Sequence, residues 1–214
     1  MRGCFISLEG GEGVGKSTQL KRLAARLHER GLEVVETREP GGSDGAETIR
    51  GLLLQGDDSR WTPETEALLF AAARADHVAR TICPALERGA WVLSDRFLDS
   101  SLAYQGWAAE LGSDNIRALH DFGSHGFLPD RTLLLELPLK TVSGRLSVRD
   151  VFGTDRIGGR EPGFHARVAE GFDALAKAEP GRIRRVDASG SPDEVTERLF
   201  AAVEDLVPSL EGRG

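Results

Sequence analysis

The sequence predicts an α/β fold in which a five-stranded parallel sheet is surrounded by helices. Two observations support this prediction. Apolar runs of strand length alternate with segments of helical periodicity, which is the pattern of successive β-α units. In addition, a glycine-rich turn joins the first apolar run directly to an amphipathic segment. No long linker divides the 214 residues, so we expect a single domain over residues 1–214.

The expected strands are short and rich in apolar residues. They cover residues 4–9, 32–38, 90–95, 131–137 and 182–189. The third run, AWVLSD, is almost entirely apolar, as expected for a strand that is buried on both faces of a parallel sheet.

The expected helices lie between these strands. The first has an apolar stripe formed by Leu20, Leu23, Ala24 and Leu27, and Gly31 ends it. Further helices are expected at 47–54, around residue 103, and at 113–122, 142–148, 164–178 and 192–206.

One long apolar helix has a clear start and an expected interruption. Thr62 supplies an N-cap, and Pro63 occupies the first turn, where a missing backbone N–H costs nothing. Pro84 should kink or restart this helix.

Composition excludes several classes of protein. The net charge of −7, with no basic run longer than Arg184-Arg185, is unlike that of a protein that binds a nucleic-acid backbone. No window reaches about 18 uninterrupted apolar residues, and the N-terminus turns glycine-rich before a signal sequence forms. We therefore expect a cytoplasmic protein without a nucleic-acid or membrane partner.

The segment GGEGVGKS at residues 10–17 fits the phosphate-binding pattern Gly-x-x-x-x-Gly-Lys-Ser/Thr. Its glycines let backbone amides converge on a phosphate, and the following helix adds the partial positive charge of its N-terminus. Lys16 would bridge the β- and γ-phosphates, and Ser17 would bind Mg²⁺. The residues expected to bind ATP are Gly10, Gly11, Glu12, Gly13, Val14, Gly15, Lys16, Ser17 and Thr18.

The loop identifies a nucleotide site but not a reaction. GTPases read guanine with an Asn/Thr-Lys-x-Asp segment, and no lysine here is followed by aspartate two positions later. Large ATPase motors need more chain than 214 residues. A small kinase with a phosphate-binding loop remains.

Further segments, in order and spacing, resemble the thymidylate kinase family. They are EGGEGVGKST (9–18), TREPGG (37–42), LLFAAAR (68–74), SDRFLDSSLAYQG (94–106), DRI (155–157), FHARVAEGF (164–172) and VDAS (186–189). The resemblance implies a three-layer α/β/α P-loop NTPase fold with a lid. It also implies transfer of a phosphoryl group from ATP to dTMP with Mg²⁺, which supplies dTTP for DNA synthesis, and a homodimer.

Phe70 and Arg74 lie one helical turn apart and so share a face. An arginine in a helix that is otherwise apolar needs an acceptor. The resemblance implies that Phe70 stacks on thymine and that Arg74 donates to its O4. The alternative is that Phe70 belongs to the core and Arg74 pairs with an internal carboxylate.

Asp95 and Arg96 end the most apolar strand, and ligands of open parallel sheets bind beyond the carboxyl ends of strands. The resemblance implies that Asp95 acts on Mg²⁺ through water and that Arg96 holds the acceptor phosphate. Lys16, Asp95 and Arg96 are therefore expected catalytic residues, and Ser17 and Asp95 expected metal ligands.

By the same resemblance, Tyr104 lies under the deoxyribose and rejects a 2′-hydroxyl, with Ser101 and Gln105 beside the base and sugar. A plain helix-surface role for Ser101 and Gln105 stays open. Glu12 would accept a hydrogen bond from the 3′-hydroxyl of dTMP, and Arg38 would lie near the acceptor phosphate.

Two further expectations concern loops. The peptide bond before Pro40 is a candidate for the cis form. The segment at about 145–161 resembles the lid, with Arg145 at its hinge. Because Gly13 stands where some relatives have an arginine, the resemblance implies a catalytic arginine from the lid, with Arg149, Arg156 and Arg160 as candidates.

The acceptor phosphate needs no general base, since a phosphate monoester with a second pKa of about 6 is mostly a dianion at neutral pH. The task is instead to bring two polyanions together between fixed cations. Two alternatives stay open: a kinase for another nucleoside monophosphate or a deoxynucleoside, and a regulatory protein that binds ATP.

Overall fold

The computed structural model describes residues 2–137 and 156–208. The expected helix at 142–148, the hinge residue Arg145 and the candidate Arg149 lie outside these residues.

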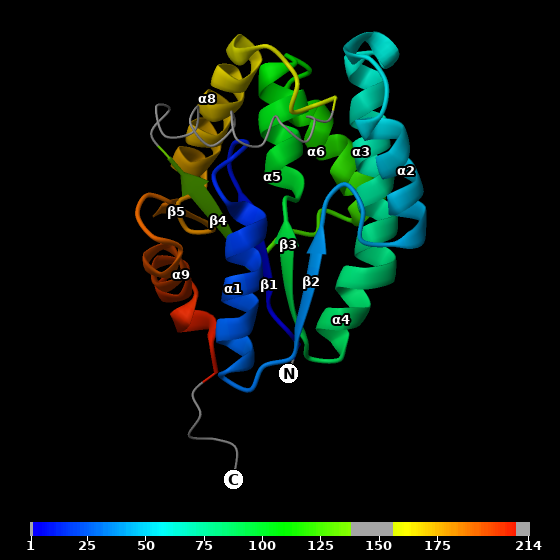
Figure 1. Ribbon diagram of the computed structural model, residues 1–214. Helices are drawn as coiled ribbons and strands as arrows, with labels where there is room; N and C mark the ends of the chain where they lie inside the picture. Colours follow the sequence, from blue (N-terminus) through cyan, green and yellow to red (C-terminus); the bar gives the residue numbers. More distant parts are fainter. Residues whose placement is uncertain (1, 138–155, 209–214) are drawn as a thin grey trace.

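A parallel sheet of five strands forms the centre of the fold, in the order β2-β3-β1-β4-β5 (Figure 1). The strands are β1 (Phe5–Glu9), β2 (Val34–Arg38), β3 (Trp91–Asp95), β4 (Arg131–Glu136) and β5 (Ile183–Asp187). Each lies within a range predicted from the sequence, so the predicted fold class is confirmed.

Helices connect the strands. They are α1 (Lys16–His28), α2 (Asp44–Leu54), α3 (Pro63–His77), α4 (Cys83–Glu87), α5 (Leu98–Ser101), α6 (Ser113–Ser124), α8 (Pro162–Ala178) and α9 (Pro192–Ala201). Wider π-helical turns follow α3 (η2, Val78–Ile82) and α5 (η3, Leu102–Ala108), and short 3-10 turns lie at η1 (Asp58–Arg60) and η5 (Glu204–Leu206).

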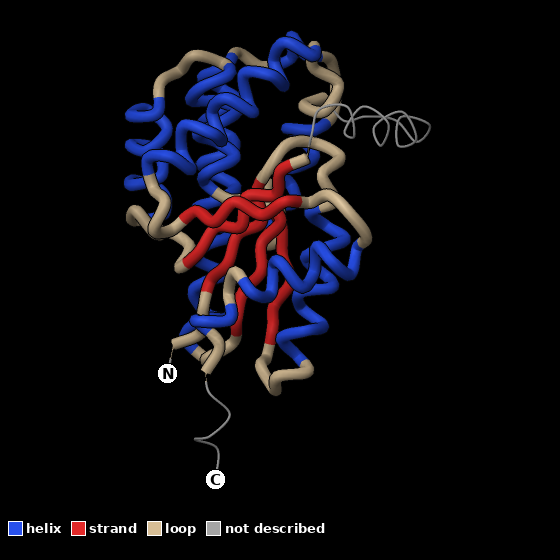
Figure 2. The backbone as a smooth tube through the Cα atoms, turned by 90° about the vertical axis from the view of Figure 1, so that its left-hand side faces the viewer, coloured by secondary structure: helices blue, strands red, loops and turns tan. Residues whose placement is uncertain are grey.

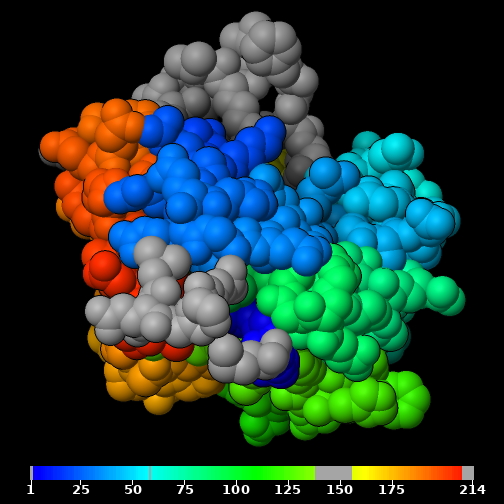
Figure 3. Space-filling view, turned by 90° about the horizontal axis from the view of Figure 1, so that it is seen from below, coloured from blue at the N-terminus to red at the C-terminus, as the bar shows by residue number. Residues whose placement is uncertain are grey.

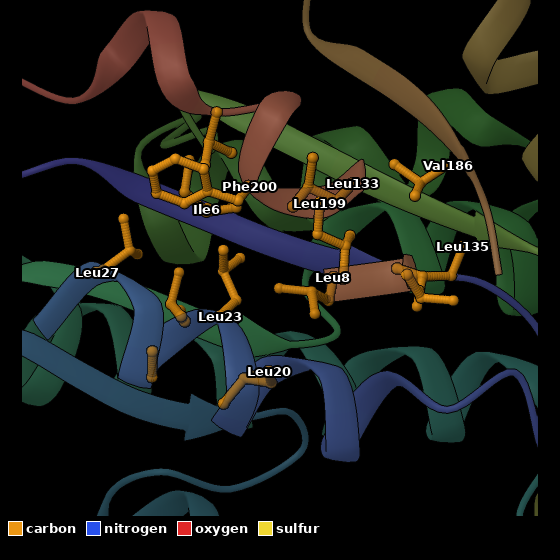
Figure 4. Close-up of a cluster of buried hydrophobic side chains, with 14 of the residues drawn as sticks. Ile6, Leu8, Leu20, Leu23, Leu27, Leu133, Leu135, Val186, Leu199 and Phe200 are labelled. Atoms are coloured by element: carbon orange, nitrogen blue, oxygen red, sulfur yellow. The ribbon is translucent and has the colours of Figure 1, made fainter. Parts of the chain in front are cut away.

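Side-chain alternation along the strands divides the core into two faces. Ile6 and Leu8 of β1 pack with α1 and α9, in the cluster that Figure 4 shows. Phe5 points to the other face and belongs to a cluster with apolar side chains of α3, α4, α5 and α6. Figure 2 shows the sheet between these two helical layers.

The long helix begins and is interrupted as the sequence predicts. The Thr62 hydroxyl accepts a hydrogen bond from the amide of Thr65, and Pro63 lies in the first turn. The helix widens into η2 before Pro84, because a proline lacks the N–H that a regular helix would use.

The last helix is shorter than predicted, and the prediction of helix to residue 206 is wrong. Helix α9 ends at Ala201, where the Arg131 guanidinium donates to the carbonyl of Ala202 at 2.8 Å. Val203 still reaches the core, so the apolar periodicity continues although the regular helix does not.

The carboxyl ends of the strands lie at the top of Figure 1. Figure 3 shows the opposite end, where α1 and the chain after it (blue) lie beside α9 (orange to red). Within residues 2–137 and 156–208, no helix has both the length and the apolar character that crossing a bilayer requires.

Candidate active site

A cavity of about 510 Å³ opens at the carboxyl ends of β1, β2 and β3. Connections from β1 and β3 leave in opposite directions across the sheet, and open α/β sheets bind ligands at this kind of switch point. Most of the predicted site residues line the cavity. They are Glu12, Gly13, Gly15, Lys16, Ser17, Thr18, Arg38, Phe70, Arg74, Asp95, Arg96, Ser101, Tyr104 and Gln105.

The phosphate-binding loop needs glycine at defined positions. Gly10 has φ +134°, and a Cβ there would lie 2.4 Å from the carbonyl oxygen of Leu135. Gly15 precedes α1 with φ +98°, a left-handed conformation that side chains disfavour. Gly10, Gly11 and Val14 do not line the cavity, and Val14 instead packs in the core.

Lys16 is the first residue of α1, and its side chain reaches back to the start of the loop. Its Nζ donates to the carbonyls of Gly11 at 2.7 Å and Gly10 at 3.2 Å. Burial, followed by the nearby Arg96 charge, lowers the pKa of Lys16 to about 8. The ammonium group is therefore held where it can meet an anion, but its charge is partly destabilised until one arrives.

Ser17 and Asp95 place a hydroxyl oxygen and a carboxylate oxygen side by side. The Ser17 hydroxyl donates to Asp95 Oδ2 at 2.5 Å, across the gap between α1 and β3. A hydroxyl and a carboxylate are hard oxygen donors of the kind that Mg²⁺ prefers. Within the described residues no group of three His, Cys, Asp or Glu side chains forms a metal site, so a cation here would need phosphate or water ligands as well.

Arg96 links the loop to the middle of the cavity. Its NH2 donates to Glu12 Oε1 at 2.5 Å and to the Tyr104 hydroxyl at 3.2 Å, and its NH1 donates to the Gly10 carbonyl at 3.0 Å. The guanidinium also lies over the Tyr104 ring, 5.1 Å from its centroid. Burial raises the pKa of Tyr104, so its hydroxyl stays protonated at neutral pH.

For Arg74 the sequence left two interpretations, a substrate-binding residue or a partner of an internal carboxylate, and the structure has features of both. It lines the cavity, and its Nε also donates to the buried carboxylate of Glu39 at 2.8 Å. Its NH2 donates to Ser101 Oγ at 2.8 Å. The internal carboxylate and the place in the cavity therefore occur together.

Glu39 has a second partner, since it lies 3.0 Å from His77 Nδ1. Burial by itself would raise the pKa of this carboxyl, but Arg74 and His77 lower it below its usual value. Glu39 is therefore a carboxylate that holds one side of Arg74 while the other side faces the cavity. The peptide bond from Glu39 to Pro40 is cis, as the sequence suggested.

Gln105 and Arg156 meet at Glu66, which is buried in the first turn of α3. Gln105 Nε2 donates to Glu66 Oε1 at 3.0 Å, and Arg160 donates to Oε2 at 2.6 Å. Arg156 pairs with the same oxygen and donates to the Leu53 carbonyl at 2.8 Å. Arg156, expected to be catalytic, is thus buried in an ion pair, while its neighbour Ile157 lines the cavity.

Arg38 lies at the rim and is half exposed. Its NH2 is 3.2 Å from both carboxylate oxygens of Glu47, which also accepts from the Gly42 amide at 2.9 Å. Arg50, on the same helix as Glu47, donates to the Pro40 carbonyl at 2.7 Å and lines the cavity.

Among the polar residues of this region that sequence reasoning missed are Glu9, Glu39, Arg50, Glu66 and Ser100. The requirement that a buried arginine have an acceptor pointed to a carboxylate partner for Arg74 without saying which one. Glu66 had a weaker signal, as an acidic residue facing the apolar side of a helix. Arg50 had none.

The fold and the cavity define a nucleotide-binding protein with a phosphate-binding loop, and the arginines that line the same cavity are typical of a phosphotransferase. A family model described as thymidylate kinase matches residues 8–199, and the chain belongs to that family. It is 62% identical over 208 residues to a thymidylate kinase of Rhizorhabdus wittichii, covering 97% of this chain and 100% of that one. It is 48% identical to a thymidylate kinase of Synechococcus sp. (95% and 96% covered) and 47% identical to one of Caulobacter vibrioides (96% and 96%).

Proposed function

We propose that this protein transfers the γ-phosphoryl group of ATP to dTMP with the help of Mg²⁺. The observation that carries the proposal is that one cavity is lined both by the phosphate-binding loop and by Phe70, Arg74, Ser101 and Gln105. A donor triphosphate at the loop and a nucleotide base at these four residues (the base end) would bring two phosphates together near Arg96.

The polar groups at the base end favour thymine. Arg74 has only hydrogen-bond donors, so it suits the O4 acceptor of thymine and opposes the amino group that cytosine has at that position. Phe70 offers an aromatic side chain one turn away on the same helix, suited to stacking. A kinase for cytidine nucleotides is therefore disfavoured, which narrows the alternatives left open by the sequence.

Catalysis would come from position and charge. Lys16 at the end of the loop and Arg96, which contacts the loop at Gly10 and Glu12, are cations that would neutralise the donor and acceptor phosphates as these approach. Glu12, which accepts from Arg96 and lies 3.3 Å from the Tyr104 hydroxyl, would hold the sugar between them. No side chain has to remove a proton from the acceptor, because the phosphate is already ionised.

Ser17 and Asp95 would hold the Mg²⁺ ion, Asp95 through a water molecule. When bound, the ion supplies charge neutralisation to the phosphate oxygens. The catalytic arginine of the lid remains a prediction: Arg156 and Arg160 are engaged by Glu66, and Arg149 lies outside the described residues.

The direct test is ADP release with ATP and Mg²⁺ in the presence of dTMP, dUMP, dCMP, UMP, AMP or no acceptor. We expect dTMP to be strongly preferred. A preference for another acceptor would overturn the assignment of dTMP as the substrate. Equal ADP release without an acceptor would favour a regulatory protein that hydrolyses ATP.

We also propose a homodimer formed through α2, α3 and α6. These helices pack side by side and expose apolar side chains: Leu52 is 39% exposed, Leu68 is 55% exposed and Phe122 is 90% exposed. Exposed apolar residues on neighbouring elements favour a protein interface. Sedimentation of a Leu68→Asp variant should show a shift to monomer, whereas Lys177→Asp on the exposed side of α8 should not.

A further inference from the structure

Glu9 is a carboxyl group for which the transfer reaction has no direct use. It is the last residue of β1, immediately before the phosphate-binding loop, and it is fully buried. Because side chains alternate along a strand, Glu9 points to the same face of the sheet as Phe5, where α5 lies. A buried carboxyl needs hydrogen-bond donors, and those donors indicate what it does.

Both oxygens of Glu9 accept hydrogen bonds from the segment that follows β3. The amide of Phe97 donates to Oε1 at 2.7 Å, and the Ser100 hydroxyl donates to Oε2 at 2.5 Å. Glu9 therefore ties the end of β1 to the turn that begins α5.

That turn contains a residue in an unfavourable backbone conformation. Arg96 has φ +74°, in the left-handed region that residues with side chains avoid. Its amide donates to the Leu8 carbonyl at 3.0 Å, and its carbonyl accepts from Ser94 Oγ at 2.7 Å. The next amide along the chain, that of Phe97, is the one that Glu9 binds, so Glu9 completes the set of contacts that hold Arg96 in this conformation.

Glu9 also reaches the side chain of Arg96 through one atom. The Ser100 hydroxyl that donates to Glu9 lies 3.0 Å from Arg96 NH1, and it accepts from that nitrogen. The same NH1 donates to the carbonyl of Gly10, the residue after Glu9. The carboxyl group of Glu9, the Ser100 hydroxyl and the Arg96 guanidinium thus form a chain that ends beside the phosphate-binding loop.

The protonation of Glu9 depends on these same contacts. Burial, and then the charge of Asp99, raises the pKa of Glu9 to about 8, against the hydrogen bond from Ser100, the charge of Arg96 and the amide of Phe97. Ser100, Arg96 and the Phe97 amide stabilise the ionised form of Glu9, and these are the groups that Glu9 positions.

We propose that Glu9 is a positioning residue for phosphoryl transfer: it holds the backbone of Arg96 in its left-handed conformation and, through Ser100, aims the guanidinium into the cavity. The proposal rests on the role proposed above for Arg96. It adds a residue outside the cavity lining to the machinery of the reaction.

Two variants test it. Glu9→Gln keeps the size and one acceptor oxygen but replaces the other oxygen by a donor, and Ser100→Ala removes the bridging hydroxyl. We expect each to lower kcat for dTMP by about 10- to 100-fold, the cost of a small displacement of a reacting group, with little change in the KM for ATP. The matched control is Ser124→Ala, a buried serine of α6 whose hydroxyl has no hydrogen-bond partner in the described structure. It should stay within about twofold of the parent.

A double-mutant cycle separates positioning from general stability. In an Arg96→Ala background, with the residual turnover measured, Glu9→Gln and Ser100→Ala should cause no further loss of kcat. A further loss of the same size, or a folded Ser100→Ala variant with parental kcat, overturns the proposal. If urea titrations show that Glu9→Gln is unfolded, the kcat of Ser100→Ala alone tests the proposal.

A crystal structure of the Ser100→Ala variant gives a result that does not depend on the substrate. We expect the Arg96 guanidinium to have left the Gly10 carbonyl, and an unchanged position overturns the proposal. Absence of dTMP turnover in the parent enzyme would instead refute the proposed function and leave this structural test standing.

Discussion

Replacing Arg74 by leucine should cost far more stability than replacing a surface arginine, because Arg74 and Glu39 are buried together. Their side chains are only 2% and 4% exposed. Without Arg74, the Glu39 carboxylate keeps only His77 as a side-chain partner, and breaking a buried ion pair costs about 3–5 kcal/mol. Arg38 and Glu47 give the contrast at 55% and 43% exposure, so Arg38→Leu should cost less than about 1 kcal/mol.

The free energy of unfolding lost in Arg74→Leu should be larger at high pH than at low pH. In the parent protein the pKa of Glu39 is lowered, so its contribution is present above the ordinary glutamate pKa and is lost as the pH falls through the lowered value. Without Arg74, only His77 opposes the effect of burial, so the pKa of Glu39 should rise from its lowered value and the remaining charge can be neutralised by protonation at a higher pH than in the parent. The stability difference between Arg74→Leu and the parent should therefore shrink between about pH 8 and about pH 5.

The measurement is urea unfolding followed by circular dichroism at both pH values, for Arg74→Leu, Arg38→Leu and the double variant Arg74→Leu/Glu39→Gln. The double variant should recover most of the lost stability, since it buries no charge, but it should keep a raised KM for dTMP because Arg74 lines the cavity. Equal losses for Arg74→Leu and Arg38→Leu, or no recovery in the double variant, would refute the reasoning.

Three further outcomes are expected. The kcat/KM for ATP should fall as the pH rises through about 8, where Lys16 loses its proton, and a Lys16→Arg variant, if its residual activity is measurable, should lack this alkaline decline. Glu66→Gln should raise the KM for dTMP several-fold, because the Gln105 amide loses its charged acceptor, and it should lower the urea midpoint; an unchanged KM would separate Glu66 from substrate binding. Gly10→Ala should abolish ATP binding in a calorimetric titration, since the new Cβ would meet the Leu135 carbonyl at 2.4 Å; parental affinity would contradict the loop geometry.

Much of the fold was predictable because it depends on short stretches of chain. The strand predicted at 90–95 is observed at Trp91–Asp95, since a run of apolar residues is itself the signal of a buried strand. Apolar spacing predicted too long a helix at α9, because Val203 keeps that spacing although the helix ends at Ala201. Periodicity reports which side chains face the core, and a tightened turn can meet that requirement as well as a helix does.

The site was predictable to a lesser degree. Lys16 and Asp95 could be placed because each is tied to the end of a predicted strand or to a loop with a strict pattern. The partner of Arg74 could not be named, because Glu39 lies 35 positions earlier, in the turn after β2. Arg156 shows the same limit, since its acceptor Glu66 lies 90 positions earlier in the chain.

By itself the sequence determined the alternation of strands and helices, the phosphate-binding loop and the position of that loop at the end of a strand. These features depend on neighbouring residues, through side-chain periodicity and the backbone freedom of glycine. Only the tertiary structure decided how the buried ionisable groups are paired: Glu39 with Arg74, Glu66 with Arg156, and Glu9 with the turn at Arg96. A charge removed from water must find its partner in space, and packing brings that partner from a distant part of the chain.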